Sequence, residues 1–263
     1  MISKIFAPDY PRNEQGLVLF PSDIQERARL FPALDPTMHV AKANLLMVKA
    51  LVEFVSEPGE TILDPFAGVG TILVGATLGY DVICIELESP YVRIIESNIK
   101  LLDDATGAMQ AIEADAFKLL PIPDFCDHMI FSPPYPMGLK KKGQMDKTSQ
   151  DLGYSAATNY SAHPDNFTNL NTFLYHQRIE RLYRKCLETV RAGGTMTIII
   201  KDHIEKGIRQ QQPDRTLRDC LRMGWELVAR NRWLTKGGGY SAINRAHGLE
   251  TVDEEDLLTF RKP

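Results

Sequence analysis

The sequence predicts a doubly wound α/β fold, in which helices cover both faces of a mainly parallel sheet. Short apolar segments typical of strands alternate with segments of helical periodicity along most of the chain. The chain has 263 residues, 44% of them hydrophobic and 24% charged, which suits a soluble protein with one large α/β domain. Polar residues follow several predicted strands, namely Asp64, Glu86, Asp115 and Ser132. Ligands of such sheets bind outside the carboxyl ends of the strands, so these residues mark the expected site.

The first half of the chain contains the clearest elements. Prolines punctuate residues 1–40, where Ser22 to Arg27 is expected to start a short helix. Leu and Val at helical spacing predict a helix over 41–56, which Pro58-Gly59 ends. Ser89 and Pro90 suit the N-cap and first position of another helix. The other elements expected here are strands over 61–64, 81–85, 109–112 and 127–131, and a helix over 72–78.

The second half begins with a long segment that has no periodicity, from about residue 137 to 169, which is typical of a functional loop or of disorder. A helix is predicted over 171–190. Its expected inward side chains are Phe173, Leu174, Ile179, Leu182, Cys186 and Leu187. The remaining expected elements are strands over 195–200, 225–233 and 256–260, and a helix over 214–223.

Charge and cysteine content restrict the setting and the partners. The net charge of −4 gives no global basic signature, so a nucleic acid would have to be bound by a local basic face. The four cysteines are far apart in apolar contexts, which favours buried free thiols and a reducing compartment. We find no signal-peptide pattern, no apolar run of transmembrane length and no metal-ligand spacing among the histidines. A cytoplasmic protein without a metal or a membrane contact is therefore expected.

A glycine-containing turn follows the predicted strand over 61–64. The segment Asp64-Pro65-Phe66-Ala67-Gly68-Val69-Gly70-Thr71 has the strand–turn–helix order of a nucleotide-type site, where glycines let the backbone approach a ligand. A dinucleotide-dependent dehydrogenase would carry its third glycine at Leu73, so the sequence departs from that pattern. Glu86 ends the next strand, where a ribose-binding carboxylate is expected. A tight loop and solvated acids are the structural alternative.

A second unusual segment, Ser132-Pro133-Pro134-Tyr135, follows the strand over 127–131. Neither proline has an N–H, and each keeps the residue before it extended. The chain therefore leaves the strand as a stiff rod with unpaired carbonyls, a hydroxyl at one end and an aromatic ring at the other. Such a rod suits a flat ligand that donates hydrogen bonds. The alternative is a proline turn that ends the strand, with Tyr135 packed inside.

Together, the two segments resemble the amino-directed DNA methyltransferases that use S-adenosylmethionine, in the subgroup whose cofactor motifs precede the catalytic motif. The resemblance covers residues 36–135 well and the rest loosely. It implies a seven-stranded, mainly parallel Rossmann-like methyltransferase sheet. It also implies that residues 36–44 and the glycine turn hold the methionine part and that Glu86 and Leu87 hold the ribose. Asp115 and the neighbouring Ala116 or Phe117 would meet the adenine. The implied methionine-binding residues are His39, Lys42, Asp64, Pro65, Phe66, Ala67, Gly68, Gly70 and Thr71.

The resemblance also assigns the chemistry to Ser132, Pro133, Pro134 and Tyr135. Ser132 Oγ and the Pro133 carbonyl oxygen would accept hydrogen bonds from the two N–H groups of an exocyclic amine. This would free the lone pair of the amine for attack on the sulfonium methyl. Tyr135 would stack on the flipped base. Serine at the first position is associated with cytosine N4 and aspartate with adenine N6, so cytosine is expected and adenine is the alternative. No Pro-Cys nucleophile is present, which argues against methylation of carbon 5.

We expect one methyltransferase domain over residues 1–263. Its parts would be a core at 36–135, a loop insertion for target recognition at 136–170, and a segment at 171–263 that completes the sheet and faces the nucleic acid. Lys140, Lys141 and Lys142 are the expected phosphate contacts. The short recognition region predicts a short target site, or dependence on a homodimer or on a restriction or specificity partner. The alternatives are an RNA methyltransferase acting on the guanine amine, and an inactive partner that only binds nucleic acid or cofactor.

Overall fold

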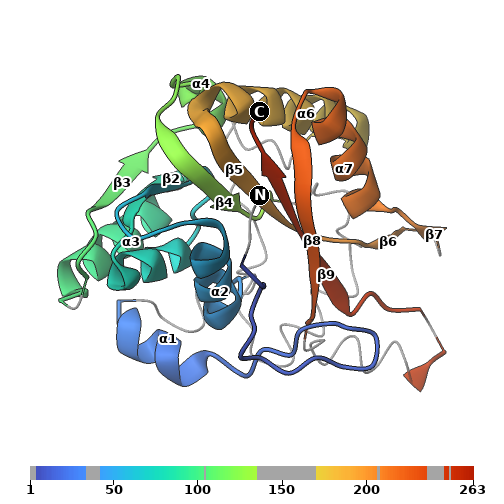
Figure 1. Ribbon diagram of the computed structural model, residues 1–263, viewed down its shortest axis with the longest axis horizontal. Helices are drawn as coiled ribbons and strands as arrows, with labels where there is room; N and C mark the ends of the chain where they lie inside the picture. Colours follow the sequence, from blue (N-terminus) through green and yellow to red (C-terminus); the bar gives the residue numbers. More distant parts are fainter. Residues whose placement is uncertain are drawn as a thin grey trace.

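A seven-stranded sheet with the strand order β3-β2-β1-β4-β5-β9-β8 forms the centre of the structure (Figure 1). The computed structural model describes residues 4–33, 42–103, 105–134, 170–205, 208–235, 246–248 and 250–263. The strands from β3 to β5 are parallel, whereas β9 runs antiparallel to both β5 and β8. The strands are β1 (Thr61–Asp64), β2 (Asp81–Glu86), β3 (Met109–Glu113), β4 (Cys126–Phe131), β5 (Val190–Lys201), β8 (Glu226–Leu234) and β9 (Glu254–Arg261).

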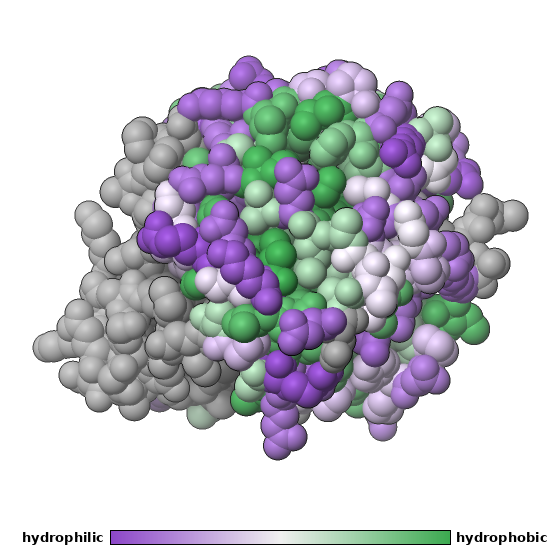
Figure 2. Space-filling model, turned by 90° about the vertical axis from the view of Figure 1, so that its left-hand side faces the viewer, coloured by the Kyte–Doolittle hydropathy of each residue, from purple (hydrophilic) through white to green (hydrophobic). Residues whose placement is uncertain are grey.

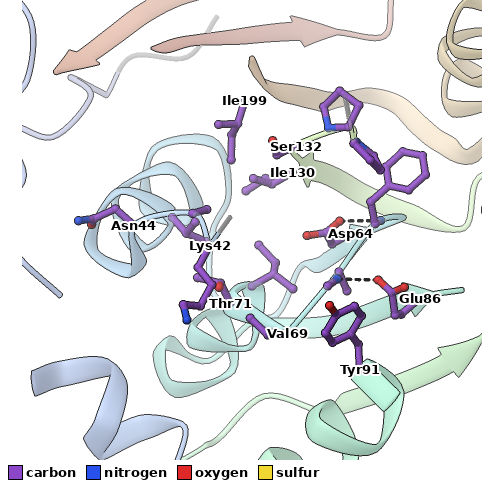
Figure 3. A pocket seen from close by; sticks show the side chains of 18 of the residues that line it. Lys42, Asn44, Asp64, Val69, Thr71, Glu86, Tyr91, Ile130, Ser132 and Ile199 are labelled. Atoms are coloured by element: carbon purple, nitrogen blue, oxygen red, sulfur yellow. Dashed lines mark hydrogen bonds between the residues drawn. The ribbon is translucent and has the colours of Figure 1, made fainter. Parts of the chain in front are cut away.

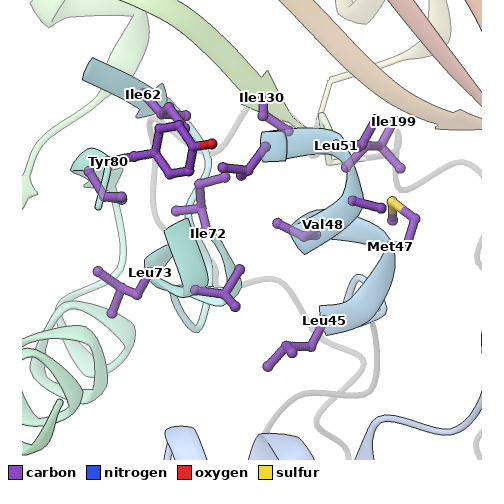
Figure 4. Close-up of a cluster of buried hydrophobic side chains, with 14 of the residues drawn as sticks. Leu45, Met47, Val48, Leu51, Ile62, Ile72, Leu73, Tyr80, Ile130 and Ile199 are labelled. Atoms are coloured by element: carbon purple, nitrogen blue, oxygen red, sulfur yellow. The ribbon is translucent and has the colours of Figure 1, made fainter. Parts of the chain in front are cut away.

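Helices cover both faces of this sheet, because alternate residues of each strand point to opposite faces. Ile62, Ile130 and Ile199 pack with α2 and the 3-10 helix η1 (Figure 4), whereas Leu63 and Met129 pack with α6 on the other face. The doubly wound, mainly parallel α/β fold is therefore confirmed. The helices are α1 (Ile24–Leu30), α2 (Leu45–Val55), η1 (Thr71–Leu78), α3 (Ser89–Leu101), α4 (Ala116–Leu119), α6 (Thr172–Thr189) and α7 (Gln212–Arg222).

Several local expectations differ from the structure. The segment after the glycine turn is a 3-10 helix, enclosed by Gly70 and Gly79, which are both left-handed. Glu88, not Ser89, is the N-cap of α3. A short hairpin of β6 (Ile204–Glu205) and β7 (Ile208–Arg209) and the four-residue helix α4 were not predicted.

The predicted inward face of α6 was partly wrong. Phe173 and Leu174 are 68% and 43% exposed, although both were expected to point inward. The buried face is instead set by Tyr175, Ile179 and Leu182, which recur at helical spacing and reach the sheet. The first turn of the helix therefore lies beyond the part that the sheet covers.

The outer edge of the sheet is β3, which is hydrogen-bonded to β2 on one side. Figure 2 shows the side of the molecule that carries this strand, with hydrophobic residues gathered centrally among hydrophilic ones. The strand is short, and Gln110 and Glu113 on it are exposed. Short edge strands with polar side chains resist pairing with other chains.

Three features predicted or excluded from the sequence can be compared with the described residues. All four cysteines are buried and free. No helix in the described ranges is long and apolar enough to cross a membrane. The same ranges contain no cluster of His, Cys, Asp and Glu that would hold a metal ion.

The pairing of β4 with β5 contains an irregularity near the start of β4. Cys126 pairs with Val190, but His128 pairs with Thr195, so β5 carries extra residues at this point and begins earlier than expected. A Cβ on Gly194 would lie 2.2 Å from the Asp127 carbonyl oxygen. Glycine is thus needed for the close approach of the two strands.

We expect the substitution Gly194→Ala to lower the free energy of unfolding by about 3 kcal/mol or more, because backbone must move to admit the methyl group. Urea denaturation would measure this change. Arg191→Ala is the matched control in the same irregular segment. Arg191 is 52% exposed and forms a surface ion pair with Asp127, so its loss should cost under about 1 kcal/mol. Equal stability of Gly194→Ala and the wild type would contradict this account.

Candidate active site

A cavity of about 580 Å³ opens at the carboxyl ends of the parallel strands, within the size range of small-molecule sites (Figure 3). The structure brings together there most of the residues that the sequence predicted. These are Lys42, Asp64, Pro65, Phe66, Ala67, Gly68, Thr71, Glu86, Leu87, Asp115, Ala116, Ser132, Pro133 and Pro134. Gly70 does not line the cavity. His39, Tyr135, Lys140, Lys141 and Lys142 lie outside the described residues.

The glycine turn after β1 is hydrogen-bonded to the end of β2. The Gly68 N–H donates to Glu86 Oε2 at 2.7 Å, and the Phe66 N–H donates to Asp64 Oδ1 at 2.8 Å. Gly68 is left-handed (φ 55°), and a Cβ there would have only the Phe66 carbonyl oxygen nearby, at 4.0 Å. The turn therefore presents bare backbone to the cavity and leaves room for a ligand.

Gly70 lies behind the turn, where its role is structural. It is the left-handed N-cap of η1 (φ 78°), and a Cβ there would approach Ile95 to 3.0 Å. A side chain at this position would therefore push η1 away from α3. Gly70 shapes the turn through backbone conformation and packing.

Two carboxyl groups, Asp64 and Glu86, lie at the ends of the neighbouring strands β1 and β2 (Figure 3). Burial raises the pKa of Asp64 to about 8, and the charge of Glu86 acts in the same direction. Burial also raises the pKa of Glu86, although backbone N–H groups, among them those of Glu88 and Gly68, oppose this shift. Acids kept in such a buried place suit a ligand that brings positive charge or hydroxyl donors.

Asp115 connects the cavity to α6. It is the N-cap of α4, where its Oδ1 accepts from the Phe117 N–H at 2.9 Å. Its Oδ2 accepts from Arg178 at 3.3 Å, and the Arg178 guanidinium carbon lies 4.5 Å from the centroid of the Phe117 ring. Asp115 and Phe117 thus form a supported wall of the cavity, with one aromatic ring held by a cation–π contact.

Ser132, Pro133 and Pro134 follow β4, the strand that pairs with β1, and line the same cavity as Asp64. Phe131, the last residue of β4, is fully buried and packs against Phe66 of the glycine turn, with ring centroids 5.9 Å apart. The Tyr175 hydroxyl of α6 donates to the Pro134 carbonyl oxygen at 2.9 Å. The described part of the proline rod is therefore held by α6, and the strand residue before it packs against the glycine turn.

Sequence reasoning missed the contribution of α1. Arg27 is 8% exposed, donates to Thr71 Oγ1 at 3.0 Å and to the Ala43 carbonyl, and pairs with Asp23. Asp23 in turn accepts from the Leu45 N–H at 2.8 Å. This network holds the residues before α2 against the glycine turn. The only sequence signal was an Asp and an Arg four residues apart, which is common on exposed helices.

Sequence reasoning also missed the far end of the cavity. Trp233, Thr235 and Glu255 line it, from β8 and β9 and the residue after β8. These residues follow the glycine turn by more than 150 positions, and no local pattern links them to it. Only the sheet order brings them to the same edge as Ser132.

Several solved structures of methyltransferases are similar to this chain. TrmN from Thermus thermophilus is 15% identical with a TM-score of 0.51, and the match covers 90% of this chain and 53% of TrmN, about half its length. A methyltransferase from Pyrococcus furiosus is 12% identical with a TM-score of 0.54, covering 91% of this chain and 95% of that one. An S-adenosylmethionine-dependent methyltransferase from Methanosarcina mazei is 12% identical with a TM-score of 0.52, covering 81% and 96%. These similarities show the Rossmann-like methyltransferase fold.

No curated protein matches the chain in sequence. A family model does match: residues 9–97 fit the N6_N4_Mtase model, described as DNA methylase. The matched segment contains α1, α2, the glycine turn and Glu86, and it ends before Ser132. The methyltransferase neighbours and this match agree with the S-adenosylmethionine cofactor expected from the sequence. Residues 9–97 thus carry the sequence pattern of a DNA methylase, the family that the resemblance had indicated.

Proposed function

We propose that this protein transfers the methyl group of S-adenosylmethionine to the exocyclic amine of a flipped base in DNA, namely N4 of cytosine. One observation carries the proposal: a single cavity joins the glycine turn and its two acids to Ser132-Pro133-Pro134. The DNA methylase match over residues 9–97 supports the choice of DNA. Ser132 at the first position of the rod supports the choice of cytosine.

The residues at one end of the cavity fit this cofactor. Gly68 leaves open space beside its backbone, Asp64 offers a carboxyl group for the ammonium of the methionine part, and Glu86 lies where the ribose hydroxyls would donate. Asp115 with Phe117 supplies a wall for the adenine. Lys42 lines the same end, and His39 belongs to the same proposed set. When bound, S-adenosylmethionine supplies an electrophilic methyl group on a sulfonium sulfur.

The described part of the rod supplies the groups that would activate the amine. The lone pair of an exocyclic amine is delocalised into its ring, so the amine is a poor nucleophile. Ser132 Oγ and the Pro133 carbonyl oxygen would accept hydrogen bonds from its two N–H groups. These bonds would favour a tetrahedral nitrogen whose lone pair is free. Because the methyl donor is already reactive, holding the amine in line with it would provide most of the acceleration. Tyr175 fixes the rod through the Pro134 carbonyl.

The free-energy cost of flipping the base out of the duplex has to be offset by contacts with the protein. Extruding a base costs a few kcal/mol, and stacking on an aromatic ring returns about 1–3 kcal/mol. Tyr135 is the proposed stacking partner. Residues 136–170 are the proposed recognition insertion, with Lys140, Lys141 and Lys142 on phosphates, within one methyltransferase domain. The short recognition region suits a homodimer or a specificity partner.

We expect the purified protein to transfer label from methyl-labelled S-adenosylmethionine to DNA, with N4-methylcytosine as the product identified by mass spectrometry. Ser132→Ala should lower the rate by at least about tenfold while binding of S-adenosylhomocysteine is retained. N6-methyladenine as the product would correct the base, and transfer to guanine in RNA alone would replace DNA with RNA. Cofactor binding without transfer to any nucleic acid would favour an inactive binding partner.

The support of the rod by Tyr175 can be tested with a matched pair of variants on α6. Tyr175→Phe removes the hydroxyl that donates to Pro134, and we expect kcat to fall about fivefold because a net hydrogen bond is worth about 1 kcal/mol. Tyr183→Phe is the control, since its hydroxyl bonds to Thr216 within the core. The control should lose stability but keep its kcat. Equal kcat values for both variants would refute the supporting role.

Cofactor affinity should depend on pH through Asp64. Its pKa of about 8 means that the carboxyl is protonated at pH 6, so binding an ammonium group there requires release of a proton. We expect the Kd of S-adenosylhomocysteine to fall by about tenfold per unit as the pH rises from about 5.5 to 7, measured by calorimetry. Asp64→Asn should bind more weakly and lose this slope. Glu86 titrates in both proteins, so the difference between the slopes reports Asp64, and equal slopes would exclude it.

A further inference from the structure

The cavity continues past Ser132 to an end where no cofactor-binding residue is proposed. Trp233 of β8 and Glu255 of β9 line this end (Figure 3 shows the neighbouring Ser132 and Ile199). Phe131 pairs with Ile198, which sets Ser132 beside Ile199. Glu255 pairs with both Lys201 and Trp233, and Lys201 lies two residues after Ile199. Residues two apart share a face, so Ile199, Glu255 and Trp233 lie on the face that Ser132 joins.

At this end of the cavity, one of the two carboxyl oxygens of Glu255 has a hydrogen-bond donor among the described residues. The Trp233 indole N–H donates to its Oε2 at 2.9 Å. Its other oxygen, Oε1, has no hydrogen-bond donor among the described residues. Lys201, across the strand pair, donates to Thr235 Oγ1 at 2.8 Å. Oε1 is not among the buried unpaired side-chain atoms of the described residues, so it is accessible and can bond a ligand group that enters the cavity.

We propose that Glu255 is a specificity-determining residue, whose Oε1 hydrogen-bonds the ring nitrogen next to the amine that Ser132 holds. The inference rests on the proposed function, because it takes a nucleobase as the occupant of this end. The indole of Trp233 would fix the carboxyl group through Oε2 and leave Oε1 for the base. Enzymes that flip bases read them through hydrogen bonds to the Watson–Crick edge, which is the edge that carries both the amine and this nitrogen.

The proton on Glu255 would decide which base fits. The ring nitrogen beside the amine is an acceptor in cytosine and adenine, so it needs a carboxyl group that donates. In guanine this nitrogen carries a hydrogen, so it needs a carboxylate that accepts. Burial raises the pKa of Glu255, which favours the protonated form. The Trp233 N–H and the positive charge of Lys201 oppose this, whereas the charge of Asp256 on the same strand adds to it. The net effect is a raised pKa of Glu255, which favours the protonated carboxyl group and therefore cytosine or adenine.

Binding at this end can be observed without turnover. The chain has two tryptophans, so its ¹⁵N spectrum contains two indole N–H signals, and Trp233→Phe assigns them. With S-adenosylhomocysteine saturating the cofactor end, cytidine should shift the Trp233 signal, because the indole is bonded to Glu255. Uridine, which has no amine, should shift it less. A Trp233 signal that moves with S-adenosylhomocysteine alone and not with any nucleoside would overturn the proposal.

Variants of Glu255 test its role in the reaction. Glu255→Ala should raise the KM for the nucleic acid by about tenfold or more, with the Kd of S-adenosylhomocysteine unchanged. Glu255→Gln should restore much of the affinity, since its amide can donate to the ring nitrogen. Glu254→Gln is the control on the same strand, because Glu254 points to the other face and pairs with Arg209. Wild-type kinetics in Glu255→Ala would overturn the proposal even if the protein methylates DNA.

Different experimental outcomes would refute the proposed function and this inference. A Trp233 shift with guanosine and none with cytidine would keep Glu255 as the base-reading residue, with its carboxylate accepting from the ring N–H, and would overturn the cytosine assignment. Methylation of cytosine in DNA together with an unmoved Trp233 signal would keep the function and overturn the inference.

Discussion

The hydrogen bond from the Gly68 N–H to Glu86 Oε2 joins the turn after β1 to the end of β2, and the geometry of the cavity depends on it. A second bond, from the Ala67 N–H to the Ile85 carbonyl oxygen at 3.0 Å, connects the same turn to the backbone of β2. The same carboxyl group also accepts from the Glu88 N–H at 2.9 Å, so it organises the start of α3 as well. A buried carboxyl group that holds two backbone segments is costly to leave unpaired, which makes the arrangement rigid. The rigid turn can then keep bare backbone facing the cavity.

The other side of the cavity depends on how closely β4 and β5 approach. After the irregular pairing around Gly194, β4 runs in register with β5 as far as Phe131, which lies opposite Ile198, and Ser132 follows. Tyr175 then holds the proline rod through Pro134, and Phe66 packs against Phe131 just before the rod. The glycine turn and the rod come from strands that are adjacent in the sheet but more than 60 residues apart in sequence. Their proximity is therefore a property of the parallel topology.

The sequence predicted the features that local patterns determine. The apolar strands, the left-handed glycines and the acids at the strand ends are all encoded within a few residues, and the structure has the strands and the turn near the expected positions. The side-chain direction of Phe173 and Leu174 was wrong because helical spacing does not reveal how much of a helix the sheet covers. Arg27 and Glu255 were missed for a related reason. Arg27 supports the cavity through Thr71, Glu255 lines it beside Trp233, and neither lies in a motif.

The antiparallel direction of β9 has a consequence for how such a protein could change its target. Because β8 runs towards the cavity and β9 runs away from it, the connection between Leu234 and Glu254 starts and finishes at the cavity edge. The connection is also far from β2 and β3, at the opposite end of the sheet order. Mutations and insertions there can therefore accumulate without disturbing the residues around Glu86. Under the proposed function, a lineage could diversify the sequences that it methylates while its methyl-donor site stayed under unchanged selection.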